Sequence, residues 1–161
     1  MKRSTLNRLT LSALIAALYA AFTTLSASMG LAIGIFEFRL SEALVILPLF
    51  TPAAVPGLFC GCILANVLCG AHVIDILIGS LATLLGALGT RALRKKPLLA
   101  LIPPVAANAL LIPPVLYFIY GLKDLGFPLL FFSFLVGEAA TAGGLSFLLY
   151  RALRPFAQFF K

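Results

Sequence analysis

The stretch that decides the fold is LTLSALIAALYAAFTTLSAS, which runs from Leu9 to Ser28 and contains no charged residue. A run of about 20 apolar residues is long enough for a helix to cross the hydrocarbon core of a bilayer. Lys2, Arg3 and Arg8 precede it. A basic start before an apolar run is also typical of a signal peptide, but the rest of this chain is equally apolar. We therefore expect a retained first transmembrane helix.

The composition of the whole chain also indicates a membrane protein. Of its 161 residues, 62% are hydrophobic and only 11% are charged, whereas a soluble domain carries about 25% charged residues. The net charge is +7, which in a soluble chain would suggest binding to nucleic acid. Basic residues gather in the cytoplasmic loops of membrane proteins, however. We therefore expect the lipid bilayer, and not nucleic acid, as the partner of a single transmembrane domain that covers residues 1–161.

Proline, glycine and charged residues divide the chain into six predicted helices. These helices cover residues 7–28, 41–50, 53–68, 73–93, 97–120 and 127–153. The second helix is too short to cross a bilayer upright. The pattern therefore predicts an all-α integral membrane bundle of six transmembrane helices, with both ends of the chain on one side.

The basic residues predict which side that is. Ten of them lie in the N-terminus, the loop between the fourth and fifth helices and the C-terminus: Lys2, Arg3, Arg8, Arg91, Arg94, Lys95, Lys96, Arg151, Arg154 and Lys161. Only Arg39 and Lys123 lie in the opposite loops. Because basic residues are enriched in cytoplasmic loops, we predict that both termini are cytoplasmic.

The chain lacks the motifs of an enzyme. It has no Gly-x-x-x-x-Gly-Lys phosphate loop and no Gly-x-Ser-x-Gly nucleophile elbow. His72 lies near Asp75 in the sequence, but no nucleophile accompanies them. We interpret Cys60, Cys62 and Cys69 as small buried side chains. We therefore expect neither catalysis nor a cofactor nor a metal site.

Polar side chains at membrane depth are the first candidates for ligand binding. Glu138 lies about 16 Å into the last predicted helix, at about 1.5 Å per residue, and Asn108 lies about as deep on the helix before it. A buried acid is costly unless it faces protein or water, which makes Glu138 a functional candidate. An internal partner such as Arg39 is the alternative, and Asn108 could simply bond a neighbouring helix. We expect an outward-opening cavity between the last three helices, covered by Phe38 and Arg39.

Four further candidates lie nearer the outer end of the predicted bundle. Asp75 and Glu42 are acids that could hold a cationic group, although Asp75 could instead cap its own helix. Asn66 and His72 flank the short loop between the third and fourth helices. For these two residues, a cap or a packing role is the alternative to ligand binding.

Small residues on the first helix predict a docking face. They form two adjoining ridges at a spacing of four: Ala13, Ala17 and Ala21, and Ala16, Ala20 and Thr24. Small side chains let another helix approach closely. We expect a partner subunit to dock here, and packing against the chain's own helices is the alternative. We assign a similar series on the fourth helix to internal packing: Gly79, Thr83, Gly86 and Thr90.

Two segments resemble the QueT family, which provides substrate-binding (S) components of energy-coupling factor (ECF) transporters. FEFRLSEAL at residues 36–44 resembles the signature of the family's first loop, and DILIGSLATL at residues 75–84 resembles its fourth helix. The resemblance implies a prokaryotic plasma-membrane protein that takes up a queuosine precursor or queuine, a 7-deazaguanine base. It also implies a transmembrane coupling subunit and two cytosolic ATPases as partners. Glu37 stands where the family more often has Gln.

A guanine-like base presents N–H donors that suit carboxylates and a flat ring that suits aromatic side chains. The expected substrate-binding set is therefore Glu138, Asn108, Asp75, Glu42, Arg39, Phe38, Glu37, His72 and Asn66. Two other functions remain open. One is an S component for another vitamin, such as riboflavin or thiamine, and the other is an accessory membrane subunit that has no ligand.

Overall fold

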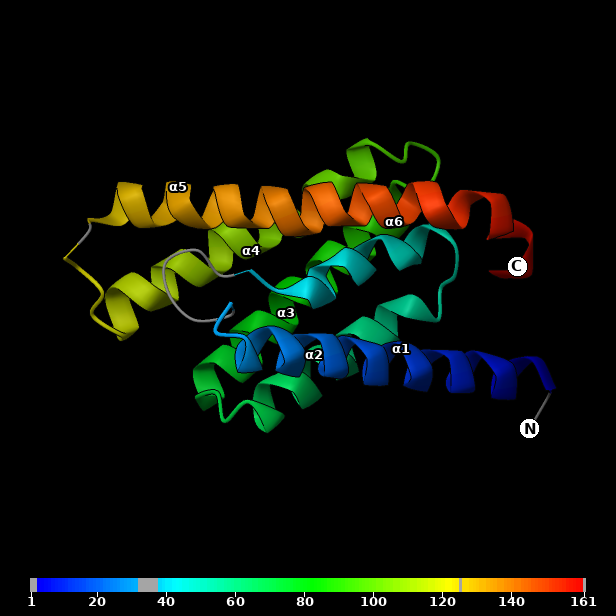
Figure 1. The fold of residues 1–161 in the computed structure, drawn as a ribbon, viewed down its shortest axis with the longest axis horizontal. Helices are drawn as coiled ribbons and strands as arrows, with labels where there is room; N and C mark the ends of the chain where they lie inside the picture. Colours follow the sequence, from blue (N-terminus) through cyan, green and yellow to red (C-terminus); the bar gives the residue numbers. More distant parts are fainter. Residues whose placement is uncertain (1–2, 32–37, 125, 161) are drawn as a thin grey trace.

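The computed structural model describes residues 3–31, 38–124 and 126–160, and every regular element in these ranges is helical. The elements are α1 (Arg3–Ser28), η1 (Leu40–Leu49), α2 (Ala54–Leu68), α3 (Val73–Ala92), η2 (Leu99–Leu101), α4 (Ile102–Pro114), η3 (Val115–Ile119), α5 (Phe127–Glu138), η4 (Ala139–Leu145), α6 (Ser146–Leu153) and η5 (Arg154–Phe160). Figure 1 shows that they form a bundle with the N- and C-terminal ends at the same end.

The six predicted helices are confirmed. The predicted helix 97–120 corresponds to η2, α4 and η3, and the predicted helix 127–153 corresponds to α5, η4 and α6. Among the described residues, four helical segments are long and apolar enough to cross a membrane: Thr5–Ser28, Val73–Ala92, Leu99–Ile119 and Phe127–Ala157. The segments Leu40–Leu49 and Ala54–Leu68 are apolar but shorter. The chain is therefore a multi-pass membrane protein.

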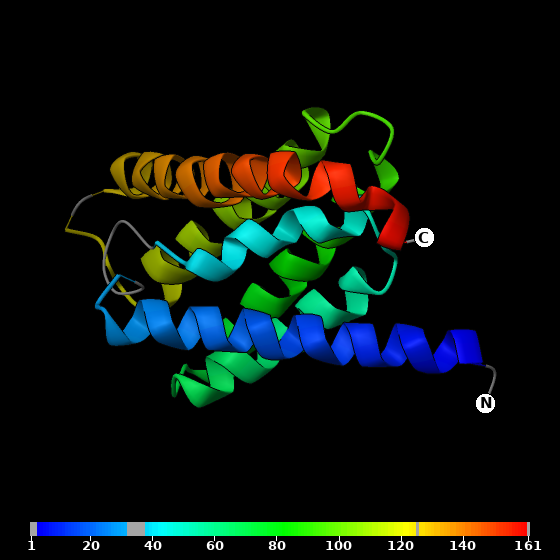
Figure 2. The same ribbon diagram turned by 45° about the vertical axis from the view of Figure 1, so that its right-hand side comes forward.

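The short helix η1 lies in the middle of the bundle. Seven of its ten residues are buried, and it contacts α1, α3, η4 and α6. Figures 1 and 2 show this cyan helix between α1 on one side and the α5–α6 rod on the other. Its sequence, LSEALVILPL, is apolar on all faces except at its start. A helix of this kind can therefore be enclosed by protein on every side.

Side chains from three other helices satisfy polar backbone groups of η1. Ser26 of α1 accepts a hydrogen bond from the Leu40 N–H at 2.9 Å, and Ser146 of α6 donates to two carbonyl oxygens in the first turn at 2.9 and 3.1 Å. At the other end, Arg91 of α3 donates to the Pro48 carbonyl oxygen at 3.0 Å. Helix ends leave backbone groups without intrahelical partners, and a membrane interior supplies no water to bond them. These contacts allow η1 to end inside the bundle.

Glycine permits the close approach of α1 and α2. A Cβ atom added to Gly61 would lie 2.8 Å from the Tyr19 Cβ and 2.9 Å from the Ala16 backbone. Only a residue without a side chain fits this contact. The contact fixes the rotation of α1, and Tyr19 therefore faces the interior, where its side chain is fully buried.

The small-residue series on α3 also packs internally, as predicted. Gly79, Thr83, Gly86 and Thr90 are all buried. A Cβ atom added to Gly86 would lie 2.7 Å from the Cα of Pro104 on α4. The series therefore brings α3 and α4 into close contact.

The cysteines differ from the prediction. Cys62 is buried in the contact between α1 and α2, but Cys60 and Cys69 are exposed, and all three are free thiols. The interpretation of all three as buried side chains is wrong for Cys60 and Cys69. Cys60 and Cys62 are two residues apart on α2 and so point to opposite sides of the helix.

We predict that Gly61→Ala destabilises the bundle. The new methyl group would overlap α1, and overpacking of this kind costs about 1–3 kcal/mol. Thermal unfolding of the purified chain in detergent should show a lower midpoint. Gly143→Ala is the matched control, because nothing lies within 4 Å of a Cβ atom at that helical position. Equal midpoints for the two variants would contradict the close packing of α1 on α2.

Candidate substrate-binding site

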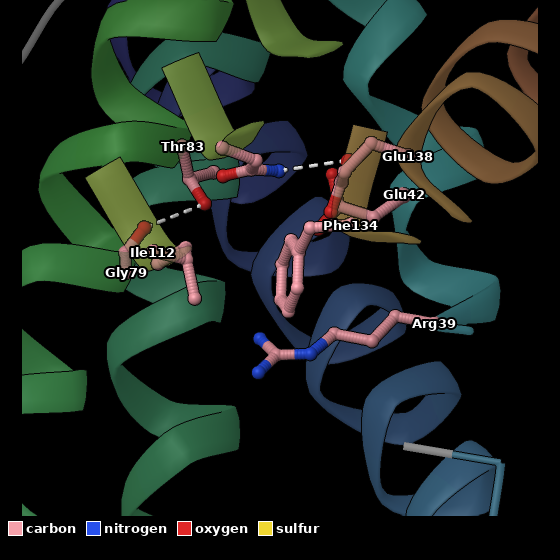
Figure 3. A pocket seen from close by; sticks show the side chains of 8 residues that line it. Arg39, Glu42, Gly79, Thr83, Ile112, Phe134 and Glu138 are labelled. Carbon is pink, nitrogen blue, oxygen red and sulfur yellow. Dashed lines mark hydrogen bonds between the residues drawn. The ribbon is translucent and has the colours of Figure 1, made fainter. Parts of the chain in front are cut away.

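A small cavity lies between η1, α3, α4 and α5, and its empty volume, part of it open to solvent, is about 260 Å³. It is lined by Arg39, Glu42, Gly79, Thr83, Asn108, Ile112, Phe134 and Glu138. Figure 3 shows Gly79, Thr83 and Ile112 on one wall and the two glutamates on the wall opposite. Four of the nine residues expected from the sequence to bind substrate therefore line one cavity: Arg39, Glu42, Asn108 and Glu138.

Asn108 and Glu138 meet across this cavity. The Asn108 side-chain amide donates a hydrogen bond to Glu138 Oε2 at 3.0 Å (Figure 3). Both side chains are buried, with 7% and 5% of their surfaces exposed. Asn108 and Glu138, which the sequence places at equal depth, are therefore in direct contact. The sequence suggested Arg39 as an internal partner of Glu138. The structure shows that Asn108 is an internal partner of Glu138.

Glu42 is held in place by a tyrosine that the sequence analysis did not single out. The Tyr19 hydroxyl of α1 donates a hydrogen bond to Glu42 Oε1 at 2.6 Å. Glu42 is only 3% exposed. One sequence signal could have identified Tyr19, because a buried tyrosine hydroxyl usually has a hydrogen-bond partner and Tyr19 is the one tyrosine in α1.

Four residues that line the cavity were also missed as site residues: Phe134, Gly79, Thr83 and Ile112. Phe134 is a buried aromatic residue of α5, and Figure 3 shows its ring inside the pocket. Gly79 and Thr83 had been assigned to packing alone, and Thr83 also donates a hydrogen bond to the Gly79 carbonyl oxygen at 3.0 Å. One sequence signal could have identified Gly79 and Thr83 as site residues. They lie in the segment at residues 75–84, which resembles the family's fourth helix. They form the α3 wall of the cavity.

Asp75 and His72 do not line the cavity and instead lie at the start of α3. The Tyr120 hydroxyl donates a hydrogen bond to Asp75 Oδ2 at 2.6 Å, and this contact raises the pKa of Tyr120 to about 12. His72 caps α3 by accepting from the Ile74 N–H at 3.3 Å, and its ring meets Tyr120 edge-on. His72 thus has the capping role considered as its alternative, whereas Asp75 bonds Tyr120. Within the described ranges, no three His, Cys, Asp or Glu side chains are placed to hold a metal ion.

Of the other expected site residues, Asn66 and Phe38 do not line the cavity. Asn66 is buried behind the α3 wall, since a Cβ atom on Gly79 would lie 3.4 Å from its side-chain nitrogen. That nitrogen is also 3.5 Å from the Cys62 sulfur. Phe38 is half-buried. Glu37 lies outside the described residues.

The structure divides the alanines of α1 into two sets. Ala13, Ala17 and Ala21 are exposed. Ala16 packs against Gly61, and Ala20 is buried in the core. One ridge therefore packs internally, and the other leaves a face of α1 open for a partner helix.

The chain is similar to one known family over most of its length. The model of the QueT transporter family matches residues 9–155. Neither the curated proteins nor the solved structures gave a match. The matched range holds all eight residues that line the cavity. Because the match also covers most of the sequence, the chain belongs to the QueT transporter family.

Proposed function

We propose that this membrane transport protein is the S component of an ECF-type importer and that it captures a 7-deazaguanine base, either a queuosine precursor or queuine. Family membership indicates a substrate-binding transport component and not an enzyme. The hydrogen-bonded pair of Asn108 and Glu138 inside a cavity carries the assignment of the ligand. A buried acid with this position in a membrane protein marks a functional site.

The pair matches the hydrogen-bonding edge of a guanine-like base. That edge carries a ring N–H and an amino group, which both donate, beside a carbonyl oxygen, which accepts. A carboxylate has room for about four hydrogen bonds, so Glu138 can accept from the base while it keeps its bond to Asn108. The second N–H of the Asn108 amide suits the carbonyl oxygen. The Phe134 ring, which also lines the cavity, offers a flat face for the base.

The size and the lining of the cavity help to distinguish a 7-deazaguanine from the two alternatives, another vitamin or no ligand at all. The empty space in the cavity, about 260 Å³, includes space open to solvent, so the enclosed part is smaller. A two-ring base suits this space better than a vitamin as large as riboflavin does. The buried polar lining argues against an accessory subunit without a ligand, because such groups are costly in a membrane unless they have a role.

The remaining subunits of the importer would dock on α1. The chain has no phosphate-binding loop, so ATP-driven uptake requires two cytosolic ATPases and a transmembrane coupling subunit. The exposed ridge of Ala13, Ala17 and Ala21 offers the close approach that a helix of the coupling subunit needs. Tyr19 lies on the opposite face of the same helix, in contact with Glu42 of the cavity.

We predict that Glu138→Gln weakens binding of a 7-deazaguanine base to the purified chain. The variant loses a charge-assisted acceptor and gains a mismatched donor, a loss of about 1.5–3 kcal/mol, or about 10- to 150-fold in affinity. Titration calorimetry measures this change. Asp124→Asn is the control, because Asp124 lies exposed in the turn before α5. A folded Glu138→Gln chain that binds within about twofold of wild type would remove Glu138 from the site.

We predict that Ala17→Leu weakens uptake in cells but leaves ligand binding to the isolated chain unchanged. The larger side chain blocks close approach of a partner helix, and the position is exposed and far around α1 from Tyr19. Ala92→Leu, at an exposed position on α3, is the matched control and should leave uptake intact. A parallel fall in binding and uptake for Ala17→Leu would instead indicate an internal packing role.

A further inference from the structure

The end of the bundle that holds both termini is strongly basic. Among the side chains that the structure describes, seven basic ones belong to this end: Arg8, Arg91, Arg94, Lys95, Lys96, Arg151 and Arg154. The acids of the same described ranges lie in the first turn of η1, at the start of α3, in the turn before α5 and at the end of α5: Glu42, Asp75, Asp124 and Glu138. Within these ranges, no acidic side chain therefore balances the basic end.

Three of the basic residues form a compact turn between α3 and η2. Arg94, Lys95 and Lys96 are consecutive, and all three are exposed. The Lys96 N–H donates a hydrogen bond to the Leu93 carbonyl oxygen at 2.8 Å, and the Ala100 N–H donates to the Lys96 carbonyl oxygen at 3.0 Å. Because these bonds keep the turn tight, three positive charges share one small surface.

This turn lies at the level of the lipid headgroups. The apolar span Val73–Ala92 ends just before it, and the span Leu99–Ile119 begins just after it. Charged residues between two spans lie where the hydrocarbon core gives way to the headgroups, because charge inside the core is costly. The cytoplasmic leaflet carries anionic lipids, which attract basic residues at this level. Lipid phosphate groups are therefore within reach of the turn.

Apolar side chains beside the turn make the surface amphipathic. Leu98 and Ile102 are 67% and 57% exposed, and residues four apart lie on the same side of a helix. They form an exposed apolar strip that leads from the basic turn into the next span. A phospholipid has the matching arrangement, a phosphate group next to acyl chains. An acidic cytosolic protein would match the charges but not the apolar strip.

We propose that the turn at residues 94–96 binds the phosphate group of an anionic phospholipid, whose acyl chains lie along Leu98 and Ile102. The site is next to a contact that the bundle needs. Arg91, one helical turn before the site, donates a hydrogen bond to the Pro48 carbonyl oxygen at 3.0 Å and so ties this end of α3 to the buried helix η1. A ligand that binds the folded chain stabilises it. Anionic lipid therefore stabilises the bundle at the point where α3 holds η1.

Titration of the purified chain with two lipids tests this proposal. The complete chain in mild detergent is titrated with phosphatidylglycerol, which is anionic, or phosphatidylcholine, which has no net charge, and native mass spectrometry counts the bound lipid. Each basic residue near an anionic surface contributes about fivefold in affinity, so we expect phosphatidylglycerol to bind more tightly by up to about 100-fold. Equal binding of the two lipids would overturn the proposal. Displacement of phosphatidylglycerol by inorganic phosphate at constant ionic strength would also overturn it, because phosphate has no acyl chains.

Matched single variants assign the binding to the turn. Lys95→Gln should weaken phosphatidylglycerol binding about fivefold and lower the unfolding midpoint in phosphatidylglycerol vesicles but not in phosphatidylcholine vesicles. Arg8→Gln removes one positive charge from α1, which lies across the bundle from the turn in Figures 1 and 2. Lys123→Gln removes one from the turn between η3 and α5. Both controls should bind the lipid as wild type does.

Two outcomes for these variants would overturn the lipid site. Equal weakening by Lys95→Gln and Arg8→Gln would indicate a diffuse surface charge without a site. Unchanged lipid binding by Lys95→Gln, together with lower uptake in cells, would indicate that the turn meets an acidic protein partner instead of a lipid.

Discussion

Hydrogen bonding of the short helix η1 inside the bundle is the constraint on which the rest of the structure depends. A ten-residue helix cannot place both of its ends in water if it lies in the middle of a membrane protein. Its backbone groups must then find partners within the protein. Ser26, Ser146 and Arg91 supply them from three different helices. These contacts hold α1, α3 and α6 around η1, and the cavity opens beside its first turn, where Glu42 lies.

Helix α1 connects the candidate site to the face on which we propose that a partner subunit docks. One face is tied to η1 through Tyr19 and Glu42 and through Thr23 and Ser41, whose hydroxyl groups lie 2.8 Å apart. The other face exposes small side chains to the bilayer. A change in the position of η1 when ligand binds would therefore reach the face on which we propose that the coupling subunit docks. Both faces belong to the same helix, so a movement of one face would also move the other.

The sequence predicted the helices but not the contacts between their faces. Apolar runs broken by proline, glycine and charge predicted all six helices, and helix geometry placed Glu138 and Asn108 at one depth. Lipid-facing and inward-facing positions are both apolar in a membrane bundle, so periodicity could not show how each helix is rotated. That rotation depends on contacts such as Gly61 against Ala16. For this reason the sequence did not reveal that Tyr19 and Phe134 face the site, that Asp75 lies outside it, or that Ala16 is packed while Ala17 is exposed.

Mass spectrometry of the small molecules that stay bound during purification tests most directly whether this chain is a receptor for a 7-deazaguanine base. The chain would be expressed in cells that contain queuosine precursors, purified in mild detergent and denatured to release its ligand. We expect a 7-deazaguanine base, at close to one molecule per chain, and its loss from the Glu138→Gln chain. Recovery of a flavin or a thiamine instead, or an empty chain even after incubation with excess 7-deazaguanine, would contradict the proposed function.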